Sequence, residues 1–325
     1  MQKSWQTLLK EVITDPAELL DQLELNPNLL PAAQRAVKLF PLRVPIGFVE
    51  RMQKGNPHDP LLLQVLPLAA EETVKLEFSQ DPLQEQRVNP LPGLLHKYQG
   101  RVLLTITGAC AINCRYCFRR HFPYTENIPG KVWQVILAYI QADTAIKEVI
   151  FSGGDPLLAN DHYLGKCIKD LESIAHVTIL RIHSRLPIVL PERITPDFLN
   201  QLSHSRLQTI VVTHSNHAKE LDHSVKTAIA SLRQREIMVL NQAVLLKGVN
   251  DNLADLVDLS ERLFACGILP YYLHLLDKVQ GATHFAVDEE KAKQLLIGLR
   301  TSLPGYLVPK CVYEQAGAPS KLPII

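Results

Sequence analysis

After about residue 95 the chain alternates short apolar runs with amphipathic stretches, and this alternation constrains its fold more than any other feature. The apolar runs predict six strands: 101–107, 148–154, 177–184, 208–214, 237–246 and 269–276. The amphipathic stretches predict six helices: 131–142, 162–173, 196–203, 219–235, 252–266 and 289–303. Because strand–helix repetition produces a parallel sheet, we predict an α/β fold, a partial (β/α)6 barrel of the TIM-like kind.

The residues before these repeats have a different texture, rich in leucine and proline. Asp15 followed by Pro16 predicts the start of a helix over 15–23, and a second helix is expected over 31–40. We therefore divide the chain into a helical N-terminal arm (1–95), a barrel (96–305) and a short C-terminal segment (306–325).

Composition excludes some classes of function. The chain has 34 Lys and Arg against 33 Asp and Glu, so no global charge favours binding to nucleic acid or to an anionic membrane. The first 20 residues lack the pattern of a secretory leader, and no run reaches the ~18 apolar residues of a membrane span. We expect a cytoplasmic protein with no nucleic-acid and no membrane partner.

Three of the six cysteines lie within eight residues, as Cys110, Cys114 and Cys117, directly after the first predicted strand. The other three are scattered through apolar patterns, so a disulfide framework is not expected. A structural zinc site needs four ligands, whereas a cubane iron–sulfur cluster held by three thiolates keeps one iron open. The spacing Cys-x3-Cys-x2-Cys therefore predicts a [4Fe-4S] cluster.

This motif, with Tyr116 before the third cysteine, resembles that of the radical S-adenosylmethionine (SAM) enzymes. The resemblance implies that the open iron binds SAM and that an electron cleaves SAM to a 5′-deoxyadenosyl radical. It also implies a barrel of the radical SAM type and a set of SAM-contacting residues at strand ends: Ser152, Gly153, Gly154, Asp155, His214 and Gln242.

Longer segments resemble the lysine 2,3-aminomutase family: "DPLLLQVLP", "HKYQGRVLLTIT", "CRYCFRRHF", "FSGGDPL", "LPIVLPERIT" and "PKCVYEQAGAPSKLP". The resemblance implies that Lys321 forms the covalent imine with pyridoxal 5′-phosphate (PLP). It further implies that Lys97, Tyr98 and Arg101 bind the PLP phosphate. The family has a run of glycines before the lysine, and this chain departs from it with Gly317, Ala318, Pro319 and Ser320.

The same resemblance implies how a substrate is held. Arg119 matches the position that pairs with the substrate carboxylate, while Asp277 and Glu314 match two acidic positions that hold the side-chain ammonium of lysine. Glu314 departs from the aspartate that the family has there. The implied reaction removes a hydrogen from the β-carbon of lysine, moves the amino group from the α- to the β-carbon and returns the hydrogen.

The end of the chain indicates a subgroup. The sequence stops four residues after Lys321 and has Asn252 where a zinc cysteine would be expected. It resembles the bacterial aminomutase that converts L-lysine to (R)-β-lysine for attachment to translation elongation factor P. This implies a pathway link to that factor and its lysyl-ligase, a flavodoxin or ferredoxin as reductant, and a homo-oligomer.

Three alternatives stay open at this point. The chain could be another amino acid 2,3-aminomutase, serving catabolism or osmolyte synthesis. It could be a radical SAM enzyme that works without PLP. It could also be a non-catalytic iron–sulfur protein. We interpret His121, His183 and His217 as structural or loop residues.

Overall fold

The computed structural model describes residues 3–324 and contains one nine-stranded sheet whose strands follow one another in chain order. Strands β2 to β8 are parallel, and β1 and β9 are antiparallel at the two edges. The strands are β1 (Leu94–Tyr98), β2 (Arg101–Thr107), β3 (Glu148–Gly153), β4 (Ile179–Ser184), β5 (Gln208–His214), β6 (Met238–Val244), β7 (Leu269–His274), β8 (Lys310–Tyr313) and β9 (Leu322–Pro323).

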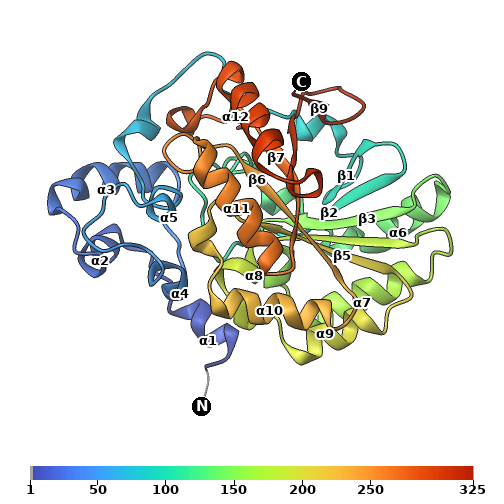
Figure 1. Ribbon diagram of the computed structural model, residues 1–325. Coiled ribbons are helices and arrows are strands. Elements are labelled where there is room, and N and C mark those ends of the chain that lie inside the picture. The colour runs from blue at the N-terminus through green and yellow to red at the C-terminus, as the bar shows by residue number, and fades with distance from the viewer. Residues whose placement is uncertain (1–2, 325) are drawn as a thin grey trace.

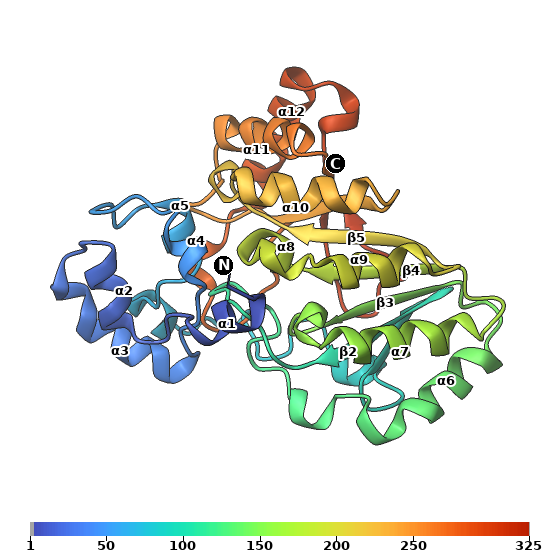
Figure 2. The same ribbon diagram turned by 90° about the horizontal axis from the view of Figure 1, so that it is seen from below.

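The helices between the parallel strands cover one side of the sheet (Figures 1 and 2). They are α6 (Trp133–Ala142), α7 (Asp161–Glu172), α8 (Leu186–Val189), α9 (Pro196–Ser203), α10 (His223–Arg233), α11 (Leu253–Ala265) and α12 (Glu289–Ser302). Each long helix turns an apolar stripe towards the strands, as α7 does with Leu164, Ile168 and Leu171. This leaves the other side of the sheet for polar side chains, where a site can form.

All six predicted strands and all six predicted helices are present, with bounds that differ by a few residues. The sheet is a partial barrel, because β1 and β9 do not pair with each other. Three further strands, β1, β8 and β9, were not predicted from the sequence. Strands β8 and β9 have only four and two residues, too few to produce a recognisable period, and β1 pairs antiparallel with its neighbour through a short turn.

The N-terminal arm carries α1 (Trp5–Lys10), α2 (Pro16–Gln22), α3 (Leu30–Leu39), α4 (Ile46–Val49) and α5 (Pro60–Leu63). The carboxylate of Asp15 accepts from the amide of Ala17 and caps α2, as the sequence predicts. The arm lies beyond the carboxyl ends of the strands (Figure 2). Its apolar side chains join those of the barrel in one core, so the arm is fixed against the sheet. The division at residues 95 and 305 stays a prediction.

Between residues 3 and 324, none of the helices has both the length and the apolar character needed to cross a membrane.

Candidate functional site

The three clustered cysteines lie on the loop that follows β2, where the carboxyl ends of the parallel strands meet. All three thiols are free and partly buried. Burial, followed by the neighbouring thiols, raises the pKa of Cys110 well above its usual value and that of Cys117 to about 12. Since thiolates are the ligands of a cluster, these thiols must lose protons when metal binds.

Within residues 3–324, no group of three or more His, Cys, Asp or Glu side chains is arranged to hold a single metal ion. A cubane cluster makes a different demand, because each thiolate binds a different iron atom and the sulfur atoms stand further apart. Three cysteines on one loop therefore fit a cluster.

The N-terminal arm holds this loop in place through a buried carboxylate. Arg115 donates to both oxygens of Glu71, at 2.8 and 2.6 Å, and Arg120 donates to the same carboxylate at 2.8 Å. The side chains of Arg115 and Glu71 have no exposed surface. No local sequence pattern indicates this contact, because Glu71 lies 44 residues before Arg115.

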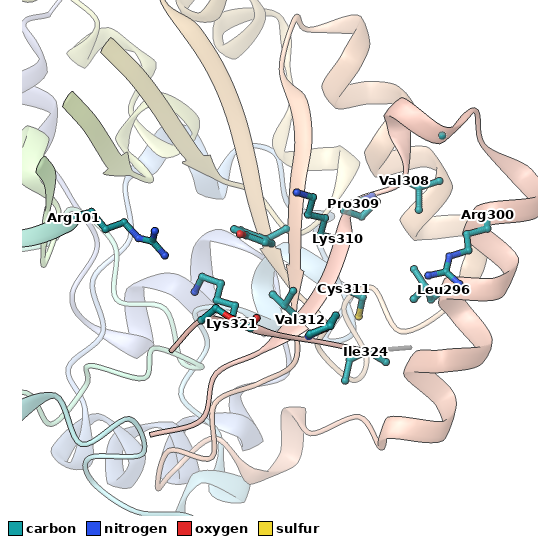
Figure 3. Close-up of a pocket in the computed structure, with 14 residues that line it drawn as sticks. Arg101, Leu296, Arg300, Val308, Pro309, Lys310, Cys311, Val312, Lys321 and Ile324 are labelled. Atoms are coloured by element: carbon teal, nitrogen blue, oxygen red, sulfur yellow. Dashed lines mark hydrogen bonds between the residues drawn. The ribbon is translucent and has the colours of Figure 1, made fainter. Parts of the chain in front are cut away.

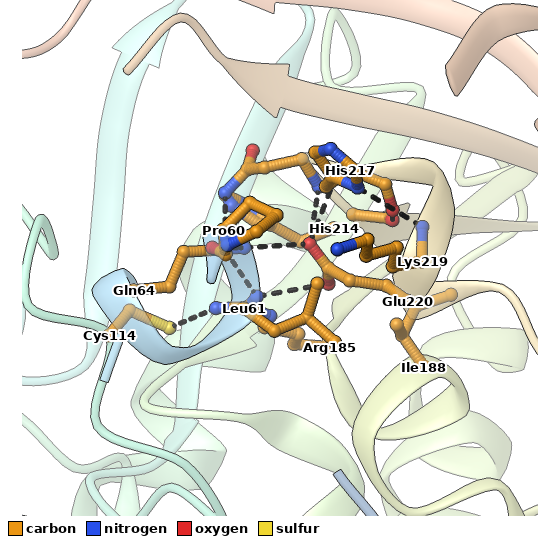
Figure 4. A network of polar contacts seen from close by, with 12 residues as sticks. Pro60, Leu61, Gln64, Cys114, Arg185, Ile188, His214, His217, Lys219 and Glu220 are labelled. Atoms are coloured by element: carbon orange, nitrogen blue, oxygen red, sulfur yellow. Dashed lines mark hydrogen bonds and ion pairs between the residues drawn. The ribbon is translucent and has the colours of Figure 1, made fainter. Parts of the chain in front are cut away.

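A second buried network includes a direct contact with Cys114, one of the three cysteines of the loop (Figure 4). Arg185, just after β4, donates from Nη1 to Cys114 Sγ and to the Tyr116 hydroxyl, both at 2.7 Å. Its Nη2 donates to Gln64 Oε1 at 2.7 Å and to Glu220 Oε2 at 3.0 Å. Sequence reasoning missed these contacts, although "HSRLP" at the end of β4 placed Arg185 among the polar strand ends.

The glycines after β3 are required by close packing of backbone against backbone. Gly153 has φ +125°, a region that side-chain-bearing residues rarely adopt. A Cβ atom on Gly154 would lie 2.3 Å from the carbonyl oxygen of Ala109, which directly precedes Cys110. The end of β3 thus forms a bare backbone cradle beside the cysteine loop. The glycines therefore set how closely the end of β3 approaches the cysteine loop, and direct contact between them and SAM stays a prediction.

Ser152 and Asp155, on either side of the cradle, are already engaged by the chain. The hydroxyl of Ser152 accepts from Arg119 Nη1 at 3.2 Å. The Asp155 carboxylate accepts from the Ser184 hydroxyl at 2.7 Å and from the amide of Arg185 at 2.8 Å. Asp155 therefore positions the loop after β4, and direct contact between Asp155 and SAM stays a prediction.

His214 and Gln242 are neighbours in register on β5 and β6. The His214 ring stacks on Tyr116, with ring centroids 5.7 Å apart, and its Nε2 lies 3.0 Å from the Tyr116 hydroxyl. Burial and then the charge of Arg185 hold the pKa of His214 well below its usual value, so the imidazole is neutral. The structure thus joins His214 to Tyr116 of the cysteine loop, which lies 98 positions earlier in the chain.

Arg119 is buried and bound by a carboxylate of the chain itself. Its Nε and Nη2 each donate to an oxygen of Glu85 at 2.7 Å, and Nη1 also lies 3.3 Å from the carbonyl oxygen of Gly153. Burial opposes the charge, but Glu85 outweighs it and raises the pKa of the Arg119 guanidinium. Glu85 was not singled out in the sequence, because it lies in the connection between the arm and β1.

The residues assigned to PLP gather on the strands at the two edges of the sheet. Glu314, which follows β8, accepts from Lys97 at 2.5 Å and from Lys321, and the Tyr98 hydroxyl lies 3.3 Å from the same carboxylate. Burial opposes ionisation of Glu314, yet Lys321 and Lys97 together lower its pKa to about 2. Glu314 is thus paired with both lysines, and a substrate ammonium would have to compete with them.

Lys321 lines a cavity of about 610 Å³ between α12, β8 and β9. Arg101 and Lys321 extend towards each other across this cavity (Figure 3). The guanidinium of Arg101 packs over the Tyr98 ring at 4.6 Å. These two groups fit an aldehyde cofactor that carries a phosphate, because the amine of Lys321 can form an imine with the aldehyde and the guanidinium of Arg101 can bind the phosphate.

The pKa of Asp277, which follows β7, lies well above its usual value. Burial, and next the negative charge of Glu314, raise the pKa of Asp277 to about 7, while Lys321 opposes the rise. Glu85 contributes in the same direction as Glu314. Asp277 follows β7, at the end of the sheet where the cysteine loop follows β2.

The three histidines interpreted as structural differ in position. His217 caps the turn after β5 by accepting from the Lys219 amide, and His121 contacts the carbonyl oxygen of Gln280. His183 instead lies on β4, and its buried Nε2 has no hydrogen-bond partner among residues 3–324. Burial and then nearby cations, including Arg119 and Lys321, hold the pKa of His183 well below its usual value. His183 is therefore a neutral ring.

The chain is similar to known proteins over almost its entire length. The family described as the Radical SAM superfamily matches residues 104–260. A protein of Escherichia coli (strain K12) named L-lysine 2,3-aminomutase is 52% identical, over 99% of this chain and 94% of its own length. A protein of the same name from Haemophilus influenzae is also 52% identical, over 98% and 95%. One from Clostridium subterminale is 33% identical, over 99% and 77%.

Among solved structures, that of Streptococcus suis SuiB bound to S-adenosylmethionine superposes with a TM-score of 0.50 at 13% identity, over 68% of this chain and 52% of that one. This likeness supports the fold alone. Given the identity to relatives over almost the entire length, the chain belongs to the L-lysine 2,3-aminomutase family of radical SAM proteins.

Proposed function

We propose that the protein is an L-lysine 2,3-aminomutase that forms (R)-β-lysine. One observation carries the proposal: Arg119, Asp277 and Lys321 lie on connections that follow the parallel strands β2, β7 and β8. The group expected to hold a carboxylate, an anion for an ammonium and the group expected to hold a cofactor therefore lie at the same end of the sheet. Free lysine presents the complementary groups, a carboxylate at one end and an ammonium at the other.

Proteins of this family use a [4Fe-4S] cluster, SAM and PLP. When bound, SAM and the cluster supply a hydrogen-abstracting radical, and PLP supplies the imine through which an amino group can migrate. Cys110, Cys114 and Cys117 would hold the cluster, with Ser152, Gly153, Gly154, Asp155, His214 and Gln242 beside SAM. Lys321, Arg101, Tyr98 and Lys97 would hold PLP.

The side chains of the protein bind and orient the substrate and shield it from water. Arg119 offers a planar guanidinium to the substrate carboxylate, and Asp277 offers a carboxylate to the ammonium. Two acidic residues, Asp277 and Glu314, would repel a glutamate side chain and favour a cationic substrate. Arg119 is only 6% exposed, so bulk water has little access to this part of the site, which suits a reactive radical.

We extend the proposal to a pathway and to partners. The product would be attached to a lysine of elongation factor P by a lysyl-ligase, and a flavodoxin or ferredoxin would reduce the cluster. We expect a cytoplasmic homo-oligomer. If deletion of the gene leaves the modification of elongation factor P unchanged, the pathway assignment is wrong even where the chemistry is right.

The test of the chemistry is anaerobic reconstitution with iron, sulfide, PLP, SAM and a reductant, followed by chiral chromatography of the products from L-lysine. We expect (R)-β-lysine from the wild type and none from Lys321→Ala, which should also lose the PLP imine absorbance. Lys293→Ala is the matched control, because Lys293 is a lysine of the outer helix α12, where it pairs only with Glu289 and Glu290.

The same assay separates the alternatives. Faster turnover of ornithine or glutamate would indicate another aminomutase. Full activity of Lys321→Ala would indicate a radical SAM enzyme without PLP. The absence of SAM cleavage in the reconstituted wild type would leave only an iron–sulfur protein without this chemistry.

A further inference from the structure

The guanidinium of Arg119 has two edges that could each receive a carboxylate, and the chain occupies one of them. Glu85 takes the Nε/Nη2 edge with two contacts of 2.7 Å. On the Nη1/Nη2 edge the contacts within residues 3–324 are longer, from Nη1 to Ser152 Oγ at 3.2 Å and to the Gly153 carbonyl at 3.3 Å. A second carboxylate would therefore meet Arg119 on the side of the glycine cradle.

Glu85 is held firmly by the segment that carries it, which connects the arm to β1. Ser79 in this segment donates its amide to the carbonyl of Lys278 and accepts from the amide of Gln280, both at 2.9 Å. Gln84 adopts the left-handed conformation, with φ 51°, and the amide of Glu85 donates to Asp81 at 3.0 Å. The segment is thus tied to the loop after β7, the loop that also carries Asp277.

The burial of the pair argues that Glu85 stays in place when a ligand binds. The side chains of Arg119 and Glu85 are only 6% and 10% exposed. Moving Glu85 away would break a buried bidentate pair, and the two backbone contacts of Ser79 oppose that movement. A ligand that shares Arg119 with Glu85 avoids both costs.

We propose that Glu85 is a positioning residue for the substrate carboxylate: it closes one edge of Arg119 and directs the carboxylate to the edge beside Ser152 and Gly153. This inference rests on the proposed function. Its consequence is geometric, since the choice of edge fixes how far the substrate β-carbon lies from the cradle. Glu85 touches neither the substrate nor a cofactor.

The test compares Glu85→Gln with the wild type in the reconstituted assay. Glutamine keeps only one acceptor oxygen, so part of the Nε/Nη2 edge of Arg119 opens to the substrate. We expect KM for lysine to stay level or fall, while kcat falls about 10- to 100-fold because the substrate is misplaced by an ångström or so. More SAM should be consumed per β-lysine formed. Glu85→Asp should restore part of kcat.

The control is Glu77→Gln, in the same segment, because Glu77 forms an exposed ion pair with Lys278 away from Arg119. It should behave as the wild type. If Glu85→Gln does not fold, Glu85→Asp carries the test, and its kcat should fall by a smaller factor. A lower KM with unchanged kcat would show that Glu85 merely competes with the substrate, and it would overturn the proposal. So would a lower melting temperature with unchanged kinetics.

A binding measurement tests the inference without turnover. Protein loaded with PLP but lacking the cluster is titrated with L-lysine and with lysinamide, which has no carboxylate, and the PLP absorbance is followed. We expect lysine to bind more tightly than lysinamide, and Glu85→Gln to keep or increase that ratio. A decreased ratio refutes positioning at a free edge. If the wild type binds lysine but makes no β-lysine, the proposed function fails and this ratio still decides the role of Glu85.

Discussion

Gly154→Ala should uncouple the cysteine loop from the rest of the site while leaving the fold intact. The added Cβ atom would lie 2.3 Å from the carbonyl oxygen of Ala109 and 2.7 Å from the carbonyl carbon of Gly108, whereas ordinary contact begins near 3.4 Å. Backbone cannot rotate away as a side chain can. The strand end and the loop must therefore separate by about 1 Å, a misplacement that typically costs about 100-fold in rate.

The assay is the rate of SAM cleavage after anaerobic reconstitution, together with the electron paramagnetic resonance spectrum of the reduced cluster with and without SAM. We expect the cluster to assemble, its spectral change on addition of SAM to weaken, and cleavage to fall about 100-fold. Gly47→Ala is the matched control. Gly47 lies in α4, and a Cβ atom there meets nothing within 4 Å, so activity should be unchanged.

The reasoning would be refuted if Gly154→Ala cleaved SAM at the wild-type rate and showed the same spectral change. That outcome would mean that the backbone at Gly154 yields without moving Cys110. A variant that loses the cluster altogether would place the effect on assembly of the loop.

Two further predictions concern buried charges. Glu71→Gln should lower the free energy of unfolding by about 3 kcal/mol in urea titration, because Arg115 and Arg120 would lose the carboxylate that pairs with them in the interior; an unchanged midpoint would contradict this. Asp277, with its pKa raised to about 7 by burial and by Glu314, should give kcat/KM for lysine an acid limb near pH 7, since only the ionised form attracts the ammonium. The same shift means that stability falls as pH rises from 3.8 to 7, because the unfolded chain releases the proton first, and Asp277→Asn should remove both effects.

Much of the fold and the chemical core of the site could be read from local patterns. Six strands follow from short apolar runs, and six helices follow from amphipathic stretches whose apolar residues mark the buried face. The three cysteines are predicted to hold a cluster because the chemistry of such a site depends on spacing within one loop. The roles of Lys321 and Arg119 are predicted by resemblance, because each lies in a short segment whose residue types match those of the family.

The tertiary structure alone decided which charges meet. Nothing near Glu85 in the sequence indicates Arg119, and nothing near Glu71 indicates the cysteine loop. Glu314 lies 217 residues from Lys97, yet it bridges that lysine to Lys321. Sequence patterns record burial and local chemistry because these act within a few residues. Partners so far apart are set by the order of the strands and by where the arm crosses their carboxyl ends.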